Sequence, residues 1–513
     1  MSTPEPDFAA FARGYDEGRP QILYTRLIAD LETPVSAYLK LGEGRENAFL
    51  LESVQGGEAR GRYSIIGLKP DVIWRCRDGR CEINRSARAD ANTFKPDPLA
   101  GDPIASLRAL IAECRMTLPA GVPPMAVGLY GYLGYDMVRL IEDLPNTPPD
   151  PLGLPDAILL RPTITAIFDN VRDEILIVTP VWPAKDDNGS TDARAAYARA
   201  SERLQDAVDD LERPGPAAPR APENLPAVSQ IDSNISHADY LKIVARAKEY
   251  ILAGDVFQVV PSQRFRRPFT LPPFSLYRAL RRLNPSPFLY NLAFPGFSIV
   301  GSSPEILVRL RDGIVTIRPI AGTRPRGKTP EDDVALADEL MGDPKERAEH
   351  LMLVDLGRND VGRVAKTGEV KVTASFFIER YSHVMHLVSN VEGKIRDGLD
   401  AVDALAAGLP AGTLSGAPKI RAMELIDEFE KEKRGAVYAG AVGYFAADGS
   451  MDTCIVLRTA VVKDGTMYVQ AGGGVVADSV PEAEYQETVN KAAALMRAAE
   501  EAVRFATAGK RGQ

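Results

Sequence analysis

Two pairs of glutamates have the residue type and the spacing to bind a metal ion. Glu346 and Glu349 form one pair, and Glu484 and Glu487 form the other. Residues three apart on a helix share one face, so each pair can present two carboxylates to the same space. Four carboxylates brought together repel one another unless a hard cation lies between them, and Mg²⁺ suits two or three carboxylates with waters and substrate oxygens. The alternative for either pair alone is a solvated helix face.

Each glutamate pair comes just after a pattern typical of a helix start. Asp343 is the expected cap of the first helix, with Pro344 in the first turn and Glu346 as the partner in a capping box. Residues 479–482 repeat this pattern, with Ser479 as cap, for a helix that should reach about residue 505. Two such pairs favour a shared metal site over two solvated faces.

Glycine-rich and basic segments are suited to hold an anionic ligand near these carboxylates. Residues 317–327 place three arginines around a Gly-Thr pair, namely Arg318, Arg324 and Arg326. Residues 411–419 form a small-residue loop before a predicted helix, whose free N–H groups can bind a carboxylate. Residues 471–474 follow a predicted strand, and their three glycines allow backbone to approach a ligand or another strand closely.

Two histidines fall in one predicted strand, residues 381–387. His383 and His386 are three positions apart, so they should face opposite sides of that strand. A histidine that points into a polar pocket can act as a general acid. The alternative for each is an ordinary packed imidazole.

The composition of the chain excludes several classes of function. Its 513 residues allow two or three domains or one large unit, and a net charge of −9 argues against nucleic acid and membrane surfaces as partners. No apolar run approaches the roughly 20 residues that span a bilayer. The four cysteines match no zinc site and have no paired spacing, which indicates thiols in a reducing cytoplasm.

Composition also divides the chain into segments. Residues 20–185 form the expected N-terminal half, and residues 186–235 combine a helix with a proline-rich linker. Residues 236–505 form the expected C-terminal domain. Residues 7–31 carry a pattern for one or two helices, and residues 256–265 are predicted to form one strand.

Four motifs in this order resemble the chorismate-utilising enzymes: residues 319–327, 348–360, 412–419 and 472–474. Within that family, the pattern is most similar to the large subunit of anthranilate synthase, component I. The resemblance covers about residues 21–503. It implies an α+β fold of stacked antiparallel β-sheets flanked by helices, with a regulatory N-terminal half and a chorismate-binding catalytic C-terminal domain.

The resemblance implies the Mg²⁺-dependent conversion of chorismate and ammonia to anthranilate and pyruvate, the first committed step of tryptophan biosynthesis. It implies that Glu349 and Glu487 are the metal ligands, with Glu346 and Glu484 supporting them directly or through water. An ion at this place would neutralise and orient the ring carboxylate of chorismate.

The resemblance also assigns the acid and the substrate contacts. His386, oriented by Glu305, matches the group that protonates the leaving 4-hydroxyl, and Thr413 belongs to the same catalytic group. Arg458 can bind the enolpyruvyl carboxylate with two hydrogen bonds. The other matching chorismate contacts are Gly322, Thr323, Tyr438, Gly472, Gly473, Gly474 and Lys491.

Two positions separate this sequence from related enzymes. Isochorismate and salicylate synthases carry a lysine where Gln258 stands, and aminodeoxychorismate synthases commonly carry a lysine where Ala321 stands. Neither residue here can activate water or attack the ring, which favours direct attack by ammonia. Two alternatives stay open: aminodeoxychorismate synthase component I, and a non-catalytic sensor of chorismate or tryptophan.

The supply of ammonia requires a further partner, and feedback inhibition requires a further ligand. The chain lacks the G-x-C-x-G elbow and the His-x-Glu pair of a glutaminase, so a separate glutamine amidotransferase subunit, component II, is expected to supply ammonia. The resemblance also implies that tryptophan inhibits the enzyme by binding between the two halves. The matching positions for this site are Glu52, Ser53, Pro287, Phe288, Leu289 and Tyr444.

Overall fold

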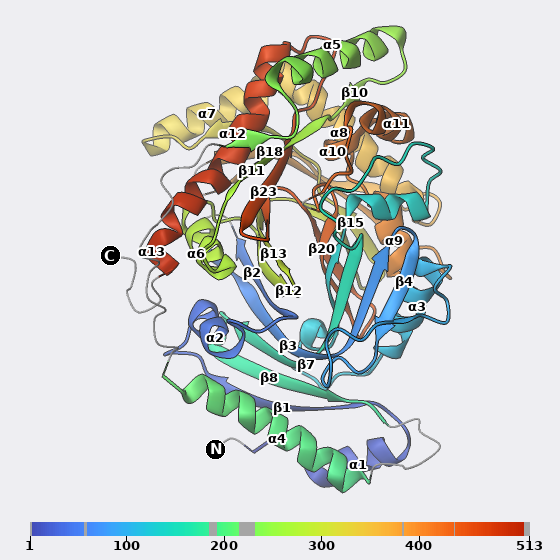
Figure 1. Cartoon of the computed structure of the whole chain (residues 1–513), viewed down its shortest axis with the longest axis vertical. Coiled ribbons are helices and arrows are strands. Elements are labelled where there is room, and N and C mark those ends of the chain that lie inside the picture. Colours follow the sequence, from blue (N-terminus) through green and yellow to red (C-terminus); the bar gives the residue numbers. More distant parts are fainter. Residues whose placement is uncertain are drawn as a thin grey trace.

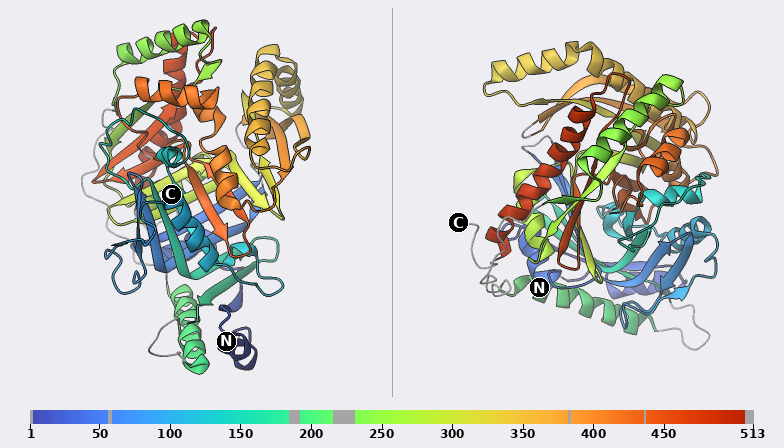
Figure 2. Two further views of the ribbon diagram at one scale, coloured as in Figure 1. Left: turned by 90° about the vertical axis from the view of Figure 1, so that its right-hand side faces the viewer. Right: turned by 45° about the horizontal axis from the view of Figure 1, so that its top comes forward.

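A computed structural model gives the fold of the chain and describes residues 3–55, 59–183, 192–214, 231–381, 384–435 and 437–506. Figure 1 shows helices on the outside of an extensive, strongly curved system of strands. Every strand pairing in it is antiparallel, in agreement with the predicted α+β class. Figure 2 shows α1 (Phe8–Asp16) and α4 (Ala193–Glu212) at one end of the molecule, and α5 (His237–Ala253) at the other.

The N-terminal half is a β-sheet whose outer face is covered by α4. Its remaining elements are β1 (Gln21–Ile28), α2 (Pro34–Leu41), β2 (Ala48–Gln55), β3 (Ala59–Arg77), β4 (Arg80–Asn84), β5 (Lys95–Pro96), α3 (Pro103–Glu113), η1 (Pro124–Ala126), β6 (Gly128–Leu133), η2 (Tyr135–Leu140), β7 (Ala157–Asp169) and β8 (Glu174–Val181). The helical pattern predicted for residues 7–31 is wrong in its second part, because β1 pairs with β8 along its whole length. Long-range pairing with a buried strand overrides the local pattern there.

The C-terminal half holds the segments that carry the predicted chemistry. Its elements, besides α5, are β9 (Asp232–Ser233), β10 (Gln258–Val259), β11 (Ser262–Pro268), α6 (Pro273–Leu283), β12 (Phe288–Phe294), β13 (Phe297–Ser303), β14 (Ile306–Arg311), β15 (Ile314–Ile317), β16 (Ile320–Pro325), α7 (Pro330–Gly342), α8 (Pro344–Gly362), β17 (Lys371–Arg380), β18 (Val384–Lys394), α9 (Ala401–Gly408), α10 (Gly412–Ser415), β19 (Gly416–Ala417), α11 (Lys419–Phe429), β20 (Ala441–Ala446), β21 (Met451–Ile455), β22 (Thr459–Lys463), β23 (Thr466–Gly472), α12 (Pro481–Glu501) and α13 (Val503–Ala506).

The single strand predicted for residues 256–265 is two strands in the structure. The break falls at Val260 and Pro261, between β10 and β11. Proline has no N–H to donate to a strand ladder, and the N–H of Val260 donates instead to the carbonyl of Ser415 at 3.0 Å. As a result, β10 pairs with β19, whereas β11 pairs with β23.

Strand pairing joins the two halves of the chain directly. β2 pairs with β3 on one side and with β12 on the other, which places Glu52 opposite Leu289. β6 likewise pairs with β7 and with β20, which places Tyr130 opposite Tyr444. Segments of the N-terminal half therefore lie beside residues of the C-terminal half in continuous sheets.

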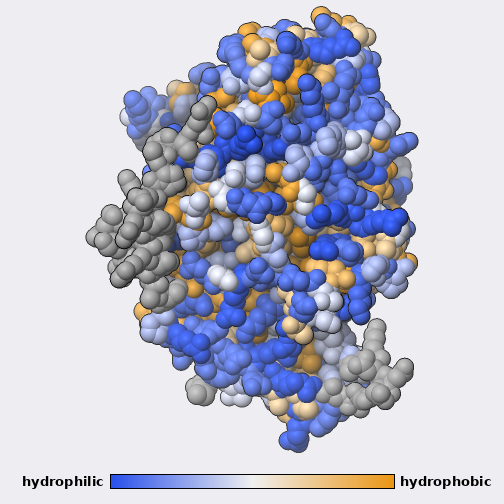
Figure 3. Space-filling view, in the orientation of Figure 1, coloured by the Kyte–Doolittle hydropathy of each residue, from blue (hydrophilic) through white to orange (hydrophobic). Residues whose placement is uncertain are grey.

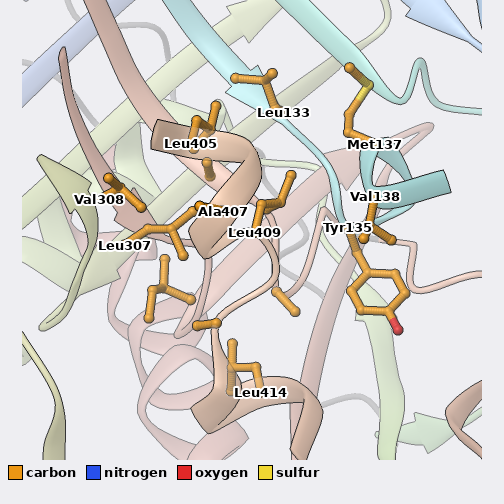
Figure 4. Close-up of a cluster of buried hydrophobic side chains, with 14 of the residues drawn as sticks. Leu133, Tyr135, Met137, Val138, Leu307, Val308, Leu405, Ala407, Leu409 and Leu414 are labelled. Atoms are coloured by element: carbon orange, nitrogen blue, oxygen red, sulfur yellow. The ribbon is translucent and has the colours of Figure 1, made fainter. Parts of the chain in front are cut away.

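A buried apolar cluster also spans the two halves. Figure 4 shows Leu133, Tyr135 and Val138 of the N-terminal half in one cluster with Leu405 of α9 and Leu414 of α10. Complete burial of one such leucine contributes about 1.5–3 kcal/mol. The turn that carries Thr413 is thus packed against a well-buried core.

The face of the molecule that is seen in the orientation of Figure 1 is mainly hydrophilic. Figure 3 shows polar side chains over most of the face in view, with apolar side chains between them. Within the described ranges, none of the helices combines the length and the apolarity needed to cross a bilayer.

Candidate active site

The first glutamate pair lies at the start of α8, as predicted. Asp343 caps this helix by accepting from the N–H groups of Lys345 at 2.9 Å and Glu346 at 3.3 Å. Glu346 Oε1 accepts a hydrogen bond from Arg324 at 3.1 Å. Burial raises the pKa of Glu349, and the nearby carboxylates of Glu346 and Glu487 raise it further. The two helix starts therefore place their carboxylates within electrostatic reach of each other.

The second pair lies on the first turns of α12, but its cap differs from the prediction. Ser479 does not cap this helix; Val480 holds the cap position without a side-chain hydrogen bond. Ser479 Oγ instead accepts from the N–H of Val476 at 3.0 Å and donates to Glu484 Oε1 at 2.7 Å. The Ser479 hydroxyl therefore binds Glu484 instead of capping the helix.

Charged groups of α12 lie close to the glycine turn and to one another. Lys491 Nζ lies 2.7 Å from Glu487 Oε1 and donates to the carbonyl of Gly472 at 2.9 Å. Glu484 Oε2 is buried, and it has no hydrogen-bond partner in the described part of the chain. Burial raises the pKa of Glu484, and the charge of Glu487 adds to the rise.

These carboxylates fit a divalent cation that is shared with a ligand. Across the described ranges, no three His, Cys, Asp or Glu side chains already form a metal-binding group. Mg²⁺ needs no such protein cage, because it usually keeps several waters and takes one or two carboxylates together with substrate oxygens. The unpaired Glu484 oxygen and the mutual repulsion that raises the pKa of Glu349 are both relieved by a cation. We therefore retain Glu349 and Glu487 as the expected ligands, with Glu346 and Glu484 beside them.

Glycines bring backbone close to the glutamates. Gly322 has a φ of +62°, and a Cβ at this position would lie 2.9 Å from Glu346 Oε2. A Cβ on Gly473 would likewise lie 2.9 Å from Glu484 Oε2. Larger residues at these two positions would displace a carboxylate, which is a physical reason for glycine in both segments.

His386 lies on β18 opposite Thr323 of β16. Its Nδ1 is 2.9 Å from the carbonyl oxygen of Gly322 and 3.1 Å from Thr323 Oγ1. A carbonyl only accepts, so Nδ1 carries the proton and Nε2 has a free lone pair. Nε2 is buried without a partner among the described residues, and burial lowers the pKa of His386 to about 4.

Glu305 lies in the turn between β13 and β14 and contacts Thr413 rather than His386. Thr413 Oγ1 is 3.5 Å from Glu305 Oε1. The carbonyl of Gly322 therefore orients the imidazole, in place of the expected carboxylate of Glu305. Burial raises the pKa of Glu305 to about 8. His383, the second histidine considered from the sequence, lies outside the described residues.

Two further predicted substrate residues, Tyr438 and Arg458, lie near Gly472 and Glu305 respectively. Tyr438 is buried, and a Cβ on Gly472 would lie 3.0 Å from its hydroxyl oxygen. Burial lowers the pKa of Arg458, with the charges of Tyr381 and Glu305 acting in the opposite direction. Arg458 also has a φ of +49°, and its carbonyl accepts from the N–H of Ser302 at 3.2 Å.

A separate cavity brings together the residues predicted to bind an inhibitor. Its volume is about 580 Å³, and its wall includes all six predicted residues: Glu52, Ser53, Pro287, Phe288, Leu289 and Tyr444. Glu52 is already paired, because its carboxylate accepts from Tyr277 and from Arg281 Nε at 2.7 Å. Glu52 thus fixes this wall of the cavity to α6.

Sequence reasoning missed the charged part of this cavity. Arg309, Arg311 and Asp452 also line it, and Asp452 Oδ2 accepts from Arg309 at 3.2 Å and from Arg311 at 2.6 Å. The two arginines alternate along β14, so strand periodicity places them on one face. That alternation was the available signal in the sequence, but the partner strand β21 was not predictable locally.

Comparison with known proteins agrees with this geometry. A family model described as chorismate binding enzyme matches residues 47–497. The chain belongs to the chorismate binding enzyme family. The predicted family and the predicted α+β fold are therefore confirmed.

Relatives in the chorismate binding enzyme family match nearly the whole chain. Anthranilate synthase component 1 of Cereibacter sphaeroides is 61% identical over 499 residues, which cover 97% of this chain and 98% of the relative. The protein of the same name from Pseudomonas aeruginosa is 50% identical over 479 residues, 92% of this chain and 94% of the relative.

Solved structures show the same fold. Anthranilate synthase component I from Streptococcus pneumoniae superposes with a TM-score of 0.73 at 37% identity, covering 92% of this chain and 99% of that one. The menaquinone-specific isochorismate synthase of Escherichia coli superposes with a TM-score of 0.68 at 19% identity, covering 96% and 98%, and shares the fold.

Proposed function

We propose that this chain is the chorismate-converting subunit of an anthranilate synthase, forming anthranilate and pyruvate from chorismate and ammonia. The proposal is supported by the 61% identity to such a protein. It is supported equally by the two glutamate pairs, which lie close together near β16, β18 and β23. In this proposal, residues 236–505 hold the reaction centre and residues 20–185 contribute mainly to regulation.

Chorismate is a dianion, so its binding requires fixed positive charge and backbone donors. Arg458 supplies a guanidinium for the enolpyruvyl carboxylate, and Lys491 adds a charge beside Gly472. A bound Mg²⁺, held by Glu349 and Glu487, would neutralise and orient the ring carboxylate. In this proposal the glycine turn of residues 472–474 brings backbone close to the substrate.

The environment of Gln258 supports ammonia as the nucleophile. Gln258 is 3% exposed, and its Oε1 has no partner within the described ranges. It lies next to a predicted substrate residue, because a Cβ on Gly474 would be 2.5 Å from Gln258 Nε2. An unpaired amide oxygen can accept an N–H of ammonia, whereas it cannot remove a proton from water.

The pKa values divide the proton chemistry between two residues. Glu305 keeps its proton up to a pH of about 8, so it can protonate the leaving 4-hydroxyl. His386, which the resemblance assigns as the acid, is neutral above a pH of about 4 and offers an acceptor at Nε2. We therefore infer that Glu305 delivers the proton and that His386 holds the substrate.

This assignment predicts how the rate depends on pH. The acid form of Glu305 is present below its pKa of about 8 and is lost as the pH rises through that value. We expect kcat/KM for chorismate to fall above about pH 8, because this parameter reports the pKa of the ligand-free chain. Glu305→Gln should lower kcat by about 10²–10⁴-fold, since an amide cannot donate a carboxyl proton.

A pH profile of anthranilate formation measures this effect. Glu82→Gln, in the N-terminal half, removes a carboxylate that is paired with Arg75; this variant is the control and should keep the native profile. An unchanged kcat in Glu305→Gln would contradict the assignment.

We further propose that a glutamine amidotransferase subunit supplies the ammonia. The purified chain should form anthranilate from chorismate, Mg²⁺ and ammonium, but not from glutamine in place of ammonium. Chromatography of the product separates anthranilate from the 4-amino product of aminodeoxychorismate synthase, the alternative activity. Glutamine-dependent turnover by the pure chain, or a 4-amino product, would contradict the proposal.

The proposal also includes an inhibitor and a cellular location for this chain. Tryptophan is the proposed ligand of the 580 Å³ cavity, because all six residues predicted for it line this cavity, two from the N-terminal half and four from the C-terminal half. A cytoplasmic location is proposed because all four cysteines are buried and unpaired, as thiols in a reducing compartment are.

A further inference from the structure

Arg434 is a buried arginine between the segments that carry the candidate substrate residues. Its side chain is 1% exposed, and that of Glu430, at the end of α11, is 5% exposed. Arg434 Nη2 donates to Glu430 Oε1 at 2.7 Å, and Nε donates to Oε2 at 3.1 Å. The guanidinium also lies 4.8 Å from the ring centre of Tyr135 and 5.5 Å from that of Tyr438. Burial of a charged group is unfavourable unless it is paired and hydrogen-bonded; this one is paired with a carboxylate, and each of its three nitrogens donates a hydrogen bond.

The same guanidinium fixes two backbone segments of the candidate active site. Its Nη1 donates to the carbonyl of Leu414 at 2.6 Å, and its Nη2 donates to the carbonyl of Val260. Leu414 follows Thr413, and Val260 is two residues after Gln258. The planar guanidinium therefore reinforces a contact between the turn of Thr413 and the strand of Gln258 that the backbone bond from Val260 to Ser415 also holds.

Glu430 extends the contact to the glycine turn. Its Oε1 accepts from the N–H and the hydroxyl of Ser262 at 2.8 and 2.9 Å. Ser262 Oγ in turn accepts from Gln470 of β23 at 2.8 Å. The carbonyl of the preceding Pro261 accepts from the N–H of Gly473 at 3.2 Å. The ion pair thus joins three site segments that are distant in sequence.

The N-terminal half supports the ion pair from the other side. Tyr135 belongs to η2, and Figure 4 shows it in the same apolar cluster as Leu414. The N–H of Lys433 donates to the carbonyl of Pro149 at 2.9 Å, and Lys433 Nζ lies 3.4 Å from Asp156. Arg434 is therefore held in place before any ligand arrives.

We propose that Arg434, held by Glu430, is a positioning residue for the proposed reaction. It helps to fix the relative positions of the turn of Thr413, the strand of Gln258 and the glycine turn, so that the chorismate site is already formed before chorismate binds. This inference rests on the proposed function. A lysine cannot replace the arginine here, because one ammonium cannot reach two carbonyls and a carboxylate in the geometry of the planar fork.

The test compares Arg434→Lys with Arg161→Lys. Arg161 forms an equivalent ion pair with Asp71 at 2.8 and 2.9 Å and lies over the ring of Trp182 at 4.6 Å, and these groups belong to the N-terminal half. Both variants should have a lower Tm than the native chain. Only Arg434→Lys should lower kcat/KM for chorismate, by about 10²-fold, because small displacements of substrate-positioning groups have effects of that size. The rise in Tm that chorismate and Mg²⁺ cause should also shrink only in this variant.

Each outcome decides the inference. A loss of Tm in Arg434→Lys with native kcat/KM and a native response to chorismate would overturn it. If Arg434→Lys does not fold, Glu430→Gln is tested instead, because the amide has the shape of the carboxylate but binds the guanidinium more weakly. An unchanged KM for chorismate in Glu430→Gln would overturn the inference. If the native chain neither binds nor converts chorismate, the proposed function itself fails and the inference fails with it.

Discussion

Replacement of Glu349 by glutamine should abolish Mg²⁺-dependent formation of anthranilate. Glu349 is the carboxylate whose pKa is raised by burial and by the two neighbouring glutamates, Glu346 and Glu487. Loss of groups that only support a metal ligand costs about 10–100-fold, so loss of the ligand itself should cost more than about 100-fold. Fluorescence of anthranilate, recorded with ammonium while Mg²⁺ is titrated, measures the effect.

The stability of this variant separates a lost metal site from a lost fold. A raised pKa means that the folded state disfavours the ionised Glu349, so the metal-free chain loses stability as the pH rises above the ordinary glutamate range. Glu349→Gln removes this penalty and should leave Tm unchanged or higher at neutral pH. Asp355→Asn is the matched control on the same helix, because the Asp355 side chain is 58% exposed and paired with Arg358, and this variant should keep native activity. Near-native turnover in Glu349→Gln would refute the assignment of this ligand.

Replacement of Ser53 by phenylalanine should make the enzyme insensitive to tryptophan. Ser53 is half-buried and lines the cavity of about 580 Å³ with Glu52 and Tyr444. If tryptophan binds in this cavity as proposed, a phenyl ring added at this wall would occupy space that the indole ring needs. We expect the inhibitory concentration of tryptophan to rise at least about tenfold, equivalent to about 1.4 kcal/mol, while turnover without tryptophan stays near native.

Inhibition curves with ammonium as the nitrogen source measure this change, and calorimetry measures tryptophan binding directly. Ser53→Ala is the matched control, because it removes the hydroxyl without filling the cavity and should keep most of the inhibition. Equal sensitivity of native enzyme and Ser53→Phe would mean that tryptophan, if it binds, does so elsewhere.

The parts of the site that sequence predicted are those with a local physical cause. Asp343 caps α8 through bonds to residues two and three positions away, so the pattern alone identified the helix start. The three-residue spacing of Glu346 and Glu349 follows from helix geometry. The family motifs then indicated which distant segments meet, which no local pattern contains.

The parts that sequence did not predict depend on long-range contacts. Ser479 has the residue type of a cap, but its hydroxyl is used by Val476 and Glu484. β1 is a strand because it pairs with β8, roughly 150 residues away. Arg434 has no recognisable motif around it, since its contacts to Leu414 and Val260 exist only in the folded chain. Asp452, which pairs with two arginines in the wall of the 580 Å³ cavity, was missed because its strand β21 meets β14 only in the folded chain.

The central claim is that the glutamates of α8 and α12 hold a divalent ion with which this chain converts chorismate. Its most direct test is the fluorescence of anthranilate from the purified chain with chorismate and ammonium, first in EDTA and then in excess Mg²⁺. The account predicts no product in EDTA and steady formation of anthranilate once Mg²⁺ is added. Equal rates under both conditions, or no anthranilate under either, would contradict it.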